Sequence, residues 1–310
     1  MNMTEPLKFE STRLRGALSA DEPMSKHVSW RAGGRATRFY VPADLADLAA
    51  FLRVLPADEA VCFVGLGSNL LVRDAGFAGT VVLVHSTHAA ARLEDGLVYA
   101  EAGVASPKVA RFAATHGFEG AEFLAGVPGT IGGALAMNAG CYGSETWEFV
   151  ARVQTIDRAG TIRMREPPDY EIGYRHCVLA GNPNGRRPEE WFTAAWFRFR
   201  AGDAARARLR IKELLARRVA TQPLNQPNAG SVFRNPPGDY AARLVEACGL
   251  KGFAIGGARI SDKHANFIVN PERRATAADI EALIAHARAE VERRFGVRLV
   301  PEVRIIGDAT

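Results

Sequence analysis

The sequence predicts an α+β fold, and three observations carry this prediction. In its first half, short apolar runs of strand length are mixed with amphipathic helices. No internal repeat or low-complexity tract is visible. The composition changes near residue 201, where an arginine-rich helix begins, so a smaller second unit is expected beyond it.

Length and composition agree with a globular protein of about two domains. The chain has 310 residues, and an allowance of roughly 150 residues per domain gives two domains, or one domain with a satellite. Hydrophobic residues make up 47% and charged residues 24%, so a disordered chain is excluded. The formal charge of +5 is too small to indicate a nucleic-acid-binding protein, but it suits an anionic small ligand.

The sequence predicts two helices and several strands before the change in composition near residue 201. Leucine and phenylalanine form one stripe over Ala43–Leu55, which predicts a helix. A second helix has Ser106 as its N-cap, Pro107 at its first position and Gly117 just past its end. Strands are expected at Ala60–Val64, Thr80–His85, Leu97–Glu101 and Trp191–Arg200.

A hairpin and a helix-rich C-terminal part complete the outline. Val153–Ile156 and Thr161–Met164 flank a turn at Asp157–Gly160, which predicts a β-hairpin. The elements expected after it are helices at Asp203–Ala220, Tyr240–Cys248 and Asp279–Phe295, the last closed by Gly296, and strands at Ala265–Val269 and Leu299–Ile306.

Cysteine usage indicates a reducing compartment and no metal site. The four cysteines form no CxxC pair, and no Cys/His cluster has zinc spacing; they are Cys62, Cys141, Cys177 and Cys248. Met1–Glu10 shows no basic-then-apolar signal segment. We therefore expect a cytoplasmic protein without a structural metal.

One uncharged stretch could be mistaken for a membrane span. Phe123–Ser144 contains 22 residues without a charge, but six glycines and a proline make it a poor spanning helix. The arginine series between Arg206 and Arg218 is interpreted as a solvated helix face. No membrane or nucleic-acid partner is expected.

Two glycine loops are the first candidates for a functional site. Gly65–Leu70 follows a predicted strand but has Leu70 where a dinucleotide fingerprint requires glycine. Its backbone N–H groups, with Ser68 and Asn69, suit a phosphate or pyrophosphate. A plain strand–turn connection is the alternative.

The second loop is Gly126–Gly133, followed by a small-residue segment to Gly140. It lacks the Gly-Lys-Ser/Thr ending of a nucleotide-triphosphate loop. Glycines at this density let a backbone pass close to something flat or anionic. Two such loops suggest a bulky cofactor held mainly by backbone; the alternative is a buried packing segment.

Three further segments bring polar groups together. Gly230–Pro236 places a hydroxyl, a cation and an amide at a turn, without a hydrolase nucleophile motif. Lys263–Asn266 is either an anion-binding edge or a structural histidine with polar neighbours. Glu302 and Arg304 are expected on one face of the last strand, where a surface ion pair is the alternative. Tyr174–Cys177 is polar but uninformative alone.

In order, these segments resemble the UDP-N-acetylenolpyruvoylglucosamine reductase family over about residues 24–308. No single motif is specific, but seven occur in the family's order. They are Arg31-Ala-Gly-Gly34, Gly65–Asp74, Gly126–Gly140, Tyr174-Arg175, Gly230–Pro236, Lys263–Asn270 and Pro301–Gly307. The chain looks like the family's shorter type II form.

The resemblance implies a flavin domain of the vanillyl-alcohol-oxidase (PCMH) type over residues 1–205 and a smaller α+β substrate domain over 206–310. FAD would be bound noncovalently across the two glycine loops. The residues implied are Gly65, Gly67, Ser68, Asn69, Gly126, Pro128, Gly129, Thr130, Gly132, Gly133, Asn138 and Gly140.

The family reaction assigns roles to three side chains. NADPH reduces the flavin, NADP leaves, and hydride then passes to the vinyl carbon of the enolpyruvyl sugar nucleotide. Arg175 and Glu302 match the residues that stabilise the enolate-like intermediate, and Ser231 matches its proton donor. Because charge develops on the substrate carboxylate, a guanidinium aimed there favours the transition state. A serine hydroxyl suffices because a carbanion is a strong base.

The resemblance also implies a set of substrate contacts and raises one departure. The implied contacts are Tyr174, Asn235, Lys263, His264, Asn266 and Arg304. Cys177 stands where the family has serine, which puts a hydrogen bond near Arg175 in doubt. A carbohydrate or alcohol oxidase of the same FAD fold is the nearest alternative, and a non-catalytic nucleotide-sugar sensor is another.

Overall fold

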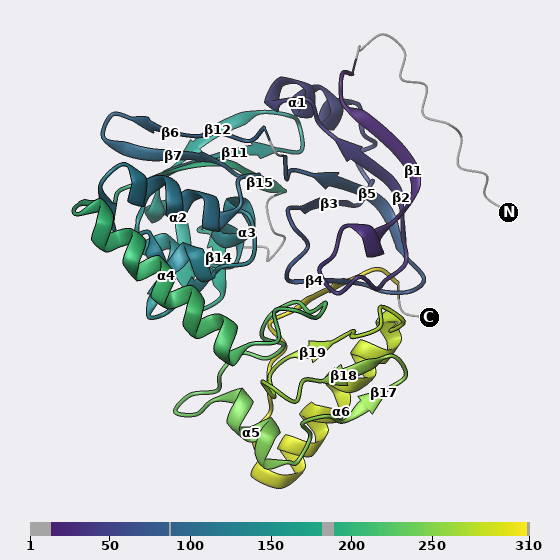
Figure 1. Cartoon of the computed structure of the whole chain (residues 1–310). Coiled ribbons are helices and arrows are strands. Elements are labelled where there is room, and N and C mark those ends of the chain that lie inside the picture. Colours follow the sequence, from purple (N-terminus) through teal and green to yellow (C-terminus); the bar gives the residue numbers. More distant parts are fainter. Residues whose placement is uncertain (1–13, 87, 182–188, 309–310) are drawn as a thin grey trace, which may run out of the picture.

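The computed structural model describes residues 14–86, 88–181 and 189–308. Met1–Glu10, where no signal segment is predicted, lies outside the described residues. Figure 1 shows sheets and helices of residues up to about 220 in its upper part and a smaller yellow-green unit below them. The helix of residues 204–221 runs from the first unit toward the second.

A four-stranded sheet opens the first unit. Its order is β1-β2-β5-β3, with β1 antiparallel and the other three strands parallel. The strands are β1 (Ala17–Pro23), β2 (Arg35–Val41), β5 (Phe77–Leu83) and β3 (Val61–Val64). Helix α1 (Leu45–Val54) packs on it through Phe51 and Leu52, as its apolar stripe predicts.

A five-stranded antiparallel sheet forms the other half of this unit. Its order is β12 (Ile162–Arg165), β11 (Val150–Asp157), β15 (Glu190–Phe197), β7 (Leu97–Glu101) and β6 (Ala91–Glu94). The predicted hairpin is confirmed: β11 pairs with β12, and Asp157 Oδ1 accepts a hydrogen bond of 2.9 Å from Thr161 N.

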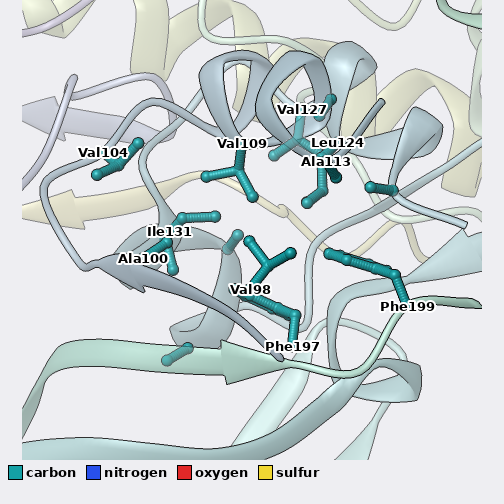
Figure 2. Close-up of a cluster of buried hydrophobic side chains, with 14 of the residues drawn as sticks. Val98, Ala100, Val104, Val109, Ala113, Leu124, Val127, Ile131, Phe197 and Phe199 are labelled. Carbon is teal, nitrogen blue, oxygen red and sulfur yellow. The ribbon is translucent and has the colours of Figure 1, made fainter. Parts of the chain in front are cut away.

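Three helices contribute to the core that packs against this sheet. They are α2 (Ser106–Thr115), α3 (Ile131–Ala136) and α4 (Ala204–Thr221). Figure 2 shows apolar side chains of α2 and α3 (Val109, Ala113 and Ile131) near the strand residues Val98 and Phe197. Helix α4 adds Ala207 and Ile211 to the same core.

The prediction that Ser106 is the N-cap of α2 is wrong. Ala105 holds that position, because its carbonyl accepts the first helical hydrogen bonds from Lys108 and Val109. Ser106 is the first helical residue, and its buried hydroxyl has no hydrogen-bond partner among the described residues.

The C-terminal unit contains a three-stranded sheet and two helices. They are β17 (Ala254–Ile255), β18 (Ala258–Ile260), β19 (Ile268–Val269), α5 (Ala241–Ala247) and α6 (Ala277–Phe295). The strand predicted from Ala265 starts only at Ile268, because Phe267 N turns back to the His264 carbonyl. Gly296 closes α6 with φ +67°, as predicted.

The predicted strand Leu299–Ile306 is also shorter than expected. Only β20 (Arg304–Ile306) is a strand, and it pairs in parallel with β4 (Leu70–Val72). Before it, Glu302 N donates to the Val232 carbonyl at 2.7 Å. The chain changes partners here, so Glu302 and Arg304 do not share a strand face.

Short hairpins and turns complete the fold. Strands β13 (Tyr170–Gly173) and β14 (His176–Leu179) pair around Tyr174-Arg175. The other short pairs are β9 (Gly140–Cys141) with β10 (Ser144–Glu145) and β8 (Phe118–Glu119) with β16 (Arg200–Ala201). The 3-10 helices span Met24–Lys26, Glu122–Gly126, Thr146–Glu148 and Pro167–Asp169. Across the described residues, every helix is too short or too polar to cross a membrane.

Candidate active site

The two glycine loops lie against each other. A Cβ atom on Gly65 would come within 2.2 Å of Thr130 Oγ1, and one on Gly129 would lie 3.2 Å from Ser68 Oγ. Gly67 has φ +59°, and a side chain there would meet the His27 carbonyl at 2.1 Å. The two loops therefore form one surface. A side chain at Gly65 would collide with the second loop, and one at Gly67 would collide with the backbone of His27.

A cavity of about 680 Å³ opens beside these loops, within the range of small-molecule and cofactor sites, about 300–1,000 Å³. Gly65, Ser68 and Pro128 line it from the first unit, and residues 224–228 and Gly230 line it from the second. None of the described residues that line it is acidic, whereas four are basic: Lys26, Arg31, Arg218 and Arg273. The cavity suits an anionic ligand.

The loop surface also has unused hydrogen-bonding groups. Thr130 Oγ1 is buried and has no partner among the described residues. The described residues likewise provide no acceptor for the backbone N–H groups of Leu66, Gly67 and Ser68. Free N–H groups beside a basic, glycine-lined cavity fit the pyrophosphate of FAD, so the residues present fit this cofactor.

Not every residue in the predicted cofactor set faces the cavity. A Cβ on Gly126 would meet Cys141 Sγ at 2.6 Å, and one on Gly140 would meet the Ser144 carbonyl at the same distance. These two glycines serve close packing. Asn138 is buried, and its side chain bonds to Glu145, Gly173 and Trp147.

Sequence reasoning missed several cavity residues. Ser29, Arg218 and Arg273 line the cavity but lie outside the glycine loops. Arg31 also lines it, and it belongs to a motif that carried the resemblance. For Arg218 the only sequence signal was its place in an arginine-rich helix, and that pattern indicates a solvent-exposed face and not a binding site.

Arg175 and Glu302 form the centre of a second cluster. Arg175 Nε donates to Glu302 Oε1 at 2.6 Å, and each side chain is 15% exposed. The two Nη atoms of Arg175 donate to the carbonyls of Asn138 (3.4 Å) and Gly140 (3.2 Å). The hairpin turn between β13 and β14 thus brings Arg175 to a carboxylate far along the chain.

Burial raises the pKa of the Glu302 carboxyl, while the charges of Arg175 and Arg234 act in the opposite direction. The main chain of Glu302 is also fixed. Its N–H donates to Val232, and its carbonyl accepts from Asn69 Nδ2 at 3.2 Å. A residue of the first glycine loop therefore contacts Glu302 directly.

Ser231 lies next to Val232, the backbone partner of Glu302. Asn266 holds this segment with three hydrogen bonds: its carbonyl accepts from Val232 N, its Oδ1 accepts from Phe233 N, and its Nδ2 donates to the Phe233 carbonyl. The Ser231 hydroxyl has no hydrogen-bond partner among the described residues. The structure therefore brings the three predicted catalytic residues onto adjoining segments.

The remaining predicted substrate contacts are more spread out. Tyr174 is 47% exposed, with the Arg175 guanidinium 5.0 Å from its ring centre. Lys263 Nζ donates to Val219 at the end of α4, and Arg304 Nε contacts Met137 Sδ at 3.3 Å. Asn235 is exposed and accepts from Ala241 N at the start of α5.

His264 and Asn266 have structural contacts. Burial, with a smaller effect of Lys251, lowers the pKa of His264. His264 Nδ1 accepts from Asn266 N at 3.3 Å. Asn266 is buried, and its side chain makes one hydrogen bond through each of its polar atoms to the backbone of Phe233.

Cys177, the departure from the family pattern, lies in β14 and packs against the core of the first unit. Burial raises the pKa of its thiol to about 12. A thiol that stays protonated is a poor nucleophile, which argues against a covalent flavin link at this residue.

Comparison with known proteins decides the family. Residues 36–164 match the model of an FAD binding domain, and residues 222–306 match the UDP-N-acetylenolpyruvoylglucosamine reductase, C-terminal domain. The reductase of that name from Thiobacillus denitrificans is 59% identical, over 95% of this chain and 94% of that protein. The chain belongs to the UDP-N-acetylenolpyruvoylglucosamine reductase family.

Other members of the reductase family match all or nearly all of the chain. The reductase from Methylococcus capsulatus is 55% identical, over 100% of this chain and 99% of that protein. The crystal structure of the reductase from Thermus caldophilus has a TM-score of 0.76 at 28% identity, covering 94% of this chain and 98% of that chain. The predicted fold class, a flavin domain with a smaller C-terminal α+β domain, is confirmed.

Proposed function

We propose that this chain uses NADPH and bound FAD to reduce the enolpyruvyl group of UDP-N-acetylglucosamine enolpyruvate, forming UDP-N-acetylmuramate for peptidoglycan synthesis. One observation carries the proposal. Glu302, which is ion-paired with Arg175, donates its backbone N–H to Val232, the neighbour of Ser231, and the cavity beside the glycine loops reaches Gly230 on the other side of Ser231.

FAD, when bound, supplies hydride transfer. Gly65, Ser68 and Pro128 would hold it with the free N–H groups of the first loop, and Thr130 Oγ1 would offer a further hydrogen bond. Lys26, Arg31, Arg218 and Arg273 would balance the charge of a dinucleotide.

Arg175 and Glu302 would act on the substrate carboxylate. Once hydride has reached the vinyl carbon, negative charge spreads onto the neighbouring carboxylate. The guanidinium of Arg175 is fixed by three protein acceptors, so it stabilises that charge without reorganising. Because burial raises its pKa, Glu302 holds a proton to higher pH than an exposed glutamate and can donate a hydrogen bond to the same oxygens.

Ser231 would deliver the proton that completes the reaction. Its hydroxyl makes no hydrogen bond with the described residues. Asn266 holds the neighbouring backbone, because it accepts hydrogen bonds from Val232 N and Phe233 N. A hydroxyl held beside a carbanion is acidic enough to quench it. The residues proposed as outer substrate contacts are Tyr174, Asn235, Lys263, His264, Asn266 and Arg304.

The finer assignments belong to this proposal as well. They are a noncovalent FAD, NADPH as electron donor, the type II form, a cytoplasmic location, and a domain boundary near residue 205. Helix α4 begins at this boundary, and its residues Ala207 and Ile211 belong to the core of the first unit. The helix therefore packs with the first unit although the proposed boundary assigns it to the second.

A product assay tests the proposal. The purified protein is incubated with NADPH and the enolpyruvyl sugar nucleotide in the absence of oxygen, and the products are identified by mass spectrometry. We expect stoichiometric NADP and a product heavier by two hydrogens. No reduced sugar nucleotide, together with peroxide formation from a carbohydrate or alcohol and oxygen without NADPH, would instead identify the alternative oxidase.

A further inference from the structure

Two guanidinium groups lie close together in the candidate active site, because Arg234 donates a hydrogen bond to the Arg175 carbonyl. Arg175 is ion-paired with Glu302, and the charge of Arg234 also acts on Glu302. No other carboxylate in the described part of the chain pairs with either arginine. The cluster therefore carries a net positive charge with the carboxylate ionised, and a larger one with it protonated.

Arg234 is held in place from two sides. Its backbone N–H donates to the Val300 carbonyl at 2.9 Å. Its Nη2 donates to the carbonyl of Arg175 at 3.2 Å. Its Nε is buried and has no hydrogen-bond partner among the described residues. A buried, charged donor without an acceptor is costly, so such a group points to an anion that is bound during function.

Donor capacity separates the two arginines. A guanidinium has five N–H donors. Every nitrogen of Arg175 already donates to a protein acceptor. Arg234 uses only Nη2 for its side-chain contact with the protein, so most of its donors remain available. A planar carboxylate matches the pair of parallel N–H groups that a free guanidinium edge presents.

We propose that Arg234 binds the carboxylate of the enolpyruvyl group and distinguishes sugar nucleotides that carry this acid from those that lack it. This inference rests on the proposed function. Arg175 and Glu302 then act on the developing charge, whereas Arg234 provides the ground-state anion contact and the specificity.

Binding to the oxidised holoenzyme tests this role without turnover. Titration calorimetry compares two ligands, the enolpyruvyl sugar nucleotide and UDP-N-acetylglucosamine, which lacks the acid. Arg234→Gln keeps a donor for the Arg175 carbonyl but removes the charge, and Arg234→Lys keeps the charge. We expect Arg234→Gln to weaken binding of the enolpyruvyl ligand roughly 10- to 100-fold and to leave UDP-N-acetylglucosamine unchanged. Arg234→Lys keeps the charge but not the paired N–H groups, so it loses less affinity for the enolpyruvyl ligand than Arg234→Gln does, and it too leaves UDP-N-acetylglucosamine unchanged.

The outcomes are distinct. Equal weakening of both ligands by Arg234→Gln, or unchanged binding of the enolpyruvyl ligand, would overturn the assignment. A larger loss in Arg234→Lys than in Arg234→Gln would show that the positive charge contributes nothing to binding, and would overturn it too. Failure of the wild-type protein to bind the enolpyruvyl ligand would overturn the proposed function itself. The flavin absorption spectrum and UDP-N-acetylglucosamine binding report whether each variant is folded.

Discussion

Arg175 adopts a left-handed backbone conformation with φ +53°. For a residue with a side chain this costs about 1–2 kcal/mol. Asn138 Nδ2 holds the preceding Gly173 carbonyl, and Arg234 Nη2 holds that of Arg175. These contacts come from both units of the chain and offset the strain. The guanidinium is thus directed at Glu302 before any substrate arrives.

Replacing Ser231 by alanine separates the two halves of the proposed reaction. The hydroxyl is the proton donor for the second half only, so Ser231→Ala leaves reduction by NADPH nearly intact. Proton donors of this kind contribute roughly 10²- to 10⁴-fold, and we expect the second half-reaction to slow by that factor. Stopped-flow measurement of each half checks this; an equal loss in both halves contradicts the role of Ser231.

The raised pKa of Glu302 predicts a pH-dependent stability difference. A carboxyl whose pKa is higher in the folded state contributes its stability at low pH and loses it as the pH rises through the folded pKa. The amide in Glu302→Gln does not titrate. We therefore expect this variant to gain stability relative to wild type as the pH rises above the ordinary glutamate pKa of about 4.

Urea denaturation at several pH values measures this difference. A variant that instead becomes steadily less stable than wild type with rising pH would show that the ion pair with Arg175 outweighs burial.

At the scale of elements, helix α6 is anchored by the first unit. Thr276 and Asp279 form a capping box at its N-terminus. Asp74, which follows the first glycine loop, accepts from Ala277 N at 2.9 Å and Ala278 N at 2.8 Å. Arg73 pairs with Glu281 on the same helix at 3.0 Å. The Gly65–Asp74 motif thus contributes a glycine loop at its start and, through Arg73 and Asp74 at its end, holds the N-terminal part of α6.

Removal of the Asp74 hydrogen bonds to α6 destabilises the protein. Asp74→Ala leaves two helix N–H groups without their acceptor, and the loss of a capping acceptor costs about 0.5–2 kcal/mol. Asp74→Asn, which keeps one acceptor oxygen, is the matched control and loses less. Chemical denaturation of both variants gives the difference; equal stability of Asp74→Ala and wild type would show that the capping box suffices.

Elements with local signals could be predicted, and those that depend on distant partners could not. Thr276, Gly296 and the hairpin turn at Asp157–Gly160 act on their neighbours, and the structure agrees with them. Strand β20 begins only where it meets β4, a partner distant in sequence. The pairing of Arg175 with Glu302 is likewise long-range. Family resemblance suggested both residues, but spacing did not bring them together. Arg234 was noted only as the cation of the Gly230–Pro236 segment and was given no role.

At the scale of the whole molecule, Trp30 joins the two units. It is fully buried among C-terminal residues, and its Nε1 donates to the Ile268 carbonyl at 2.7 Å. Asn270 Nδ2 donates in turn to the Trp30 carbonyl at 3.0 Å. With the β4–β20 pair, these contacts make the units parts of one cooperative structure.

Trp30→Phe tests that cooperativity. The substitution leaves the buried Ile268 carbonyl without its donor, which costs about 1–3 kcal/mol. We expect the loss of helix signal and the release of flavin to shift together to lower temperature. Two separate transitions would contradict the idea that the units unfold together.

The central claim is that one protein carries out both halves of a flavin-mediated reduction, and anaerobic spectroscopy tests it most directly. NADPH is added to the yellow protein without oxygen, the visible flavin band is followed, and the enolpyruvyl sugar nucleotide is then added. Our account predicts that the band bleaches and returns rapidly on addition of the sugar nucleotide. A band that bleaches but returns only with air would contradict it.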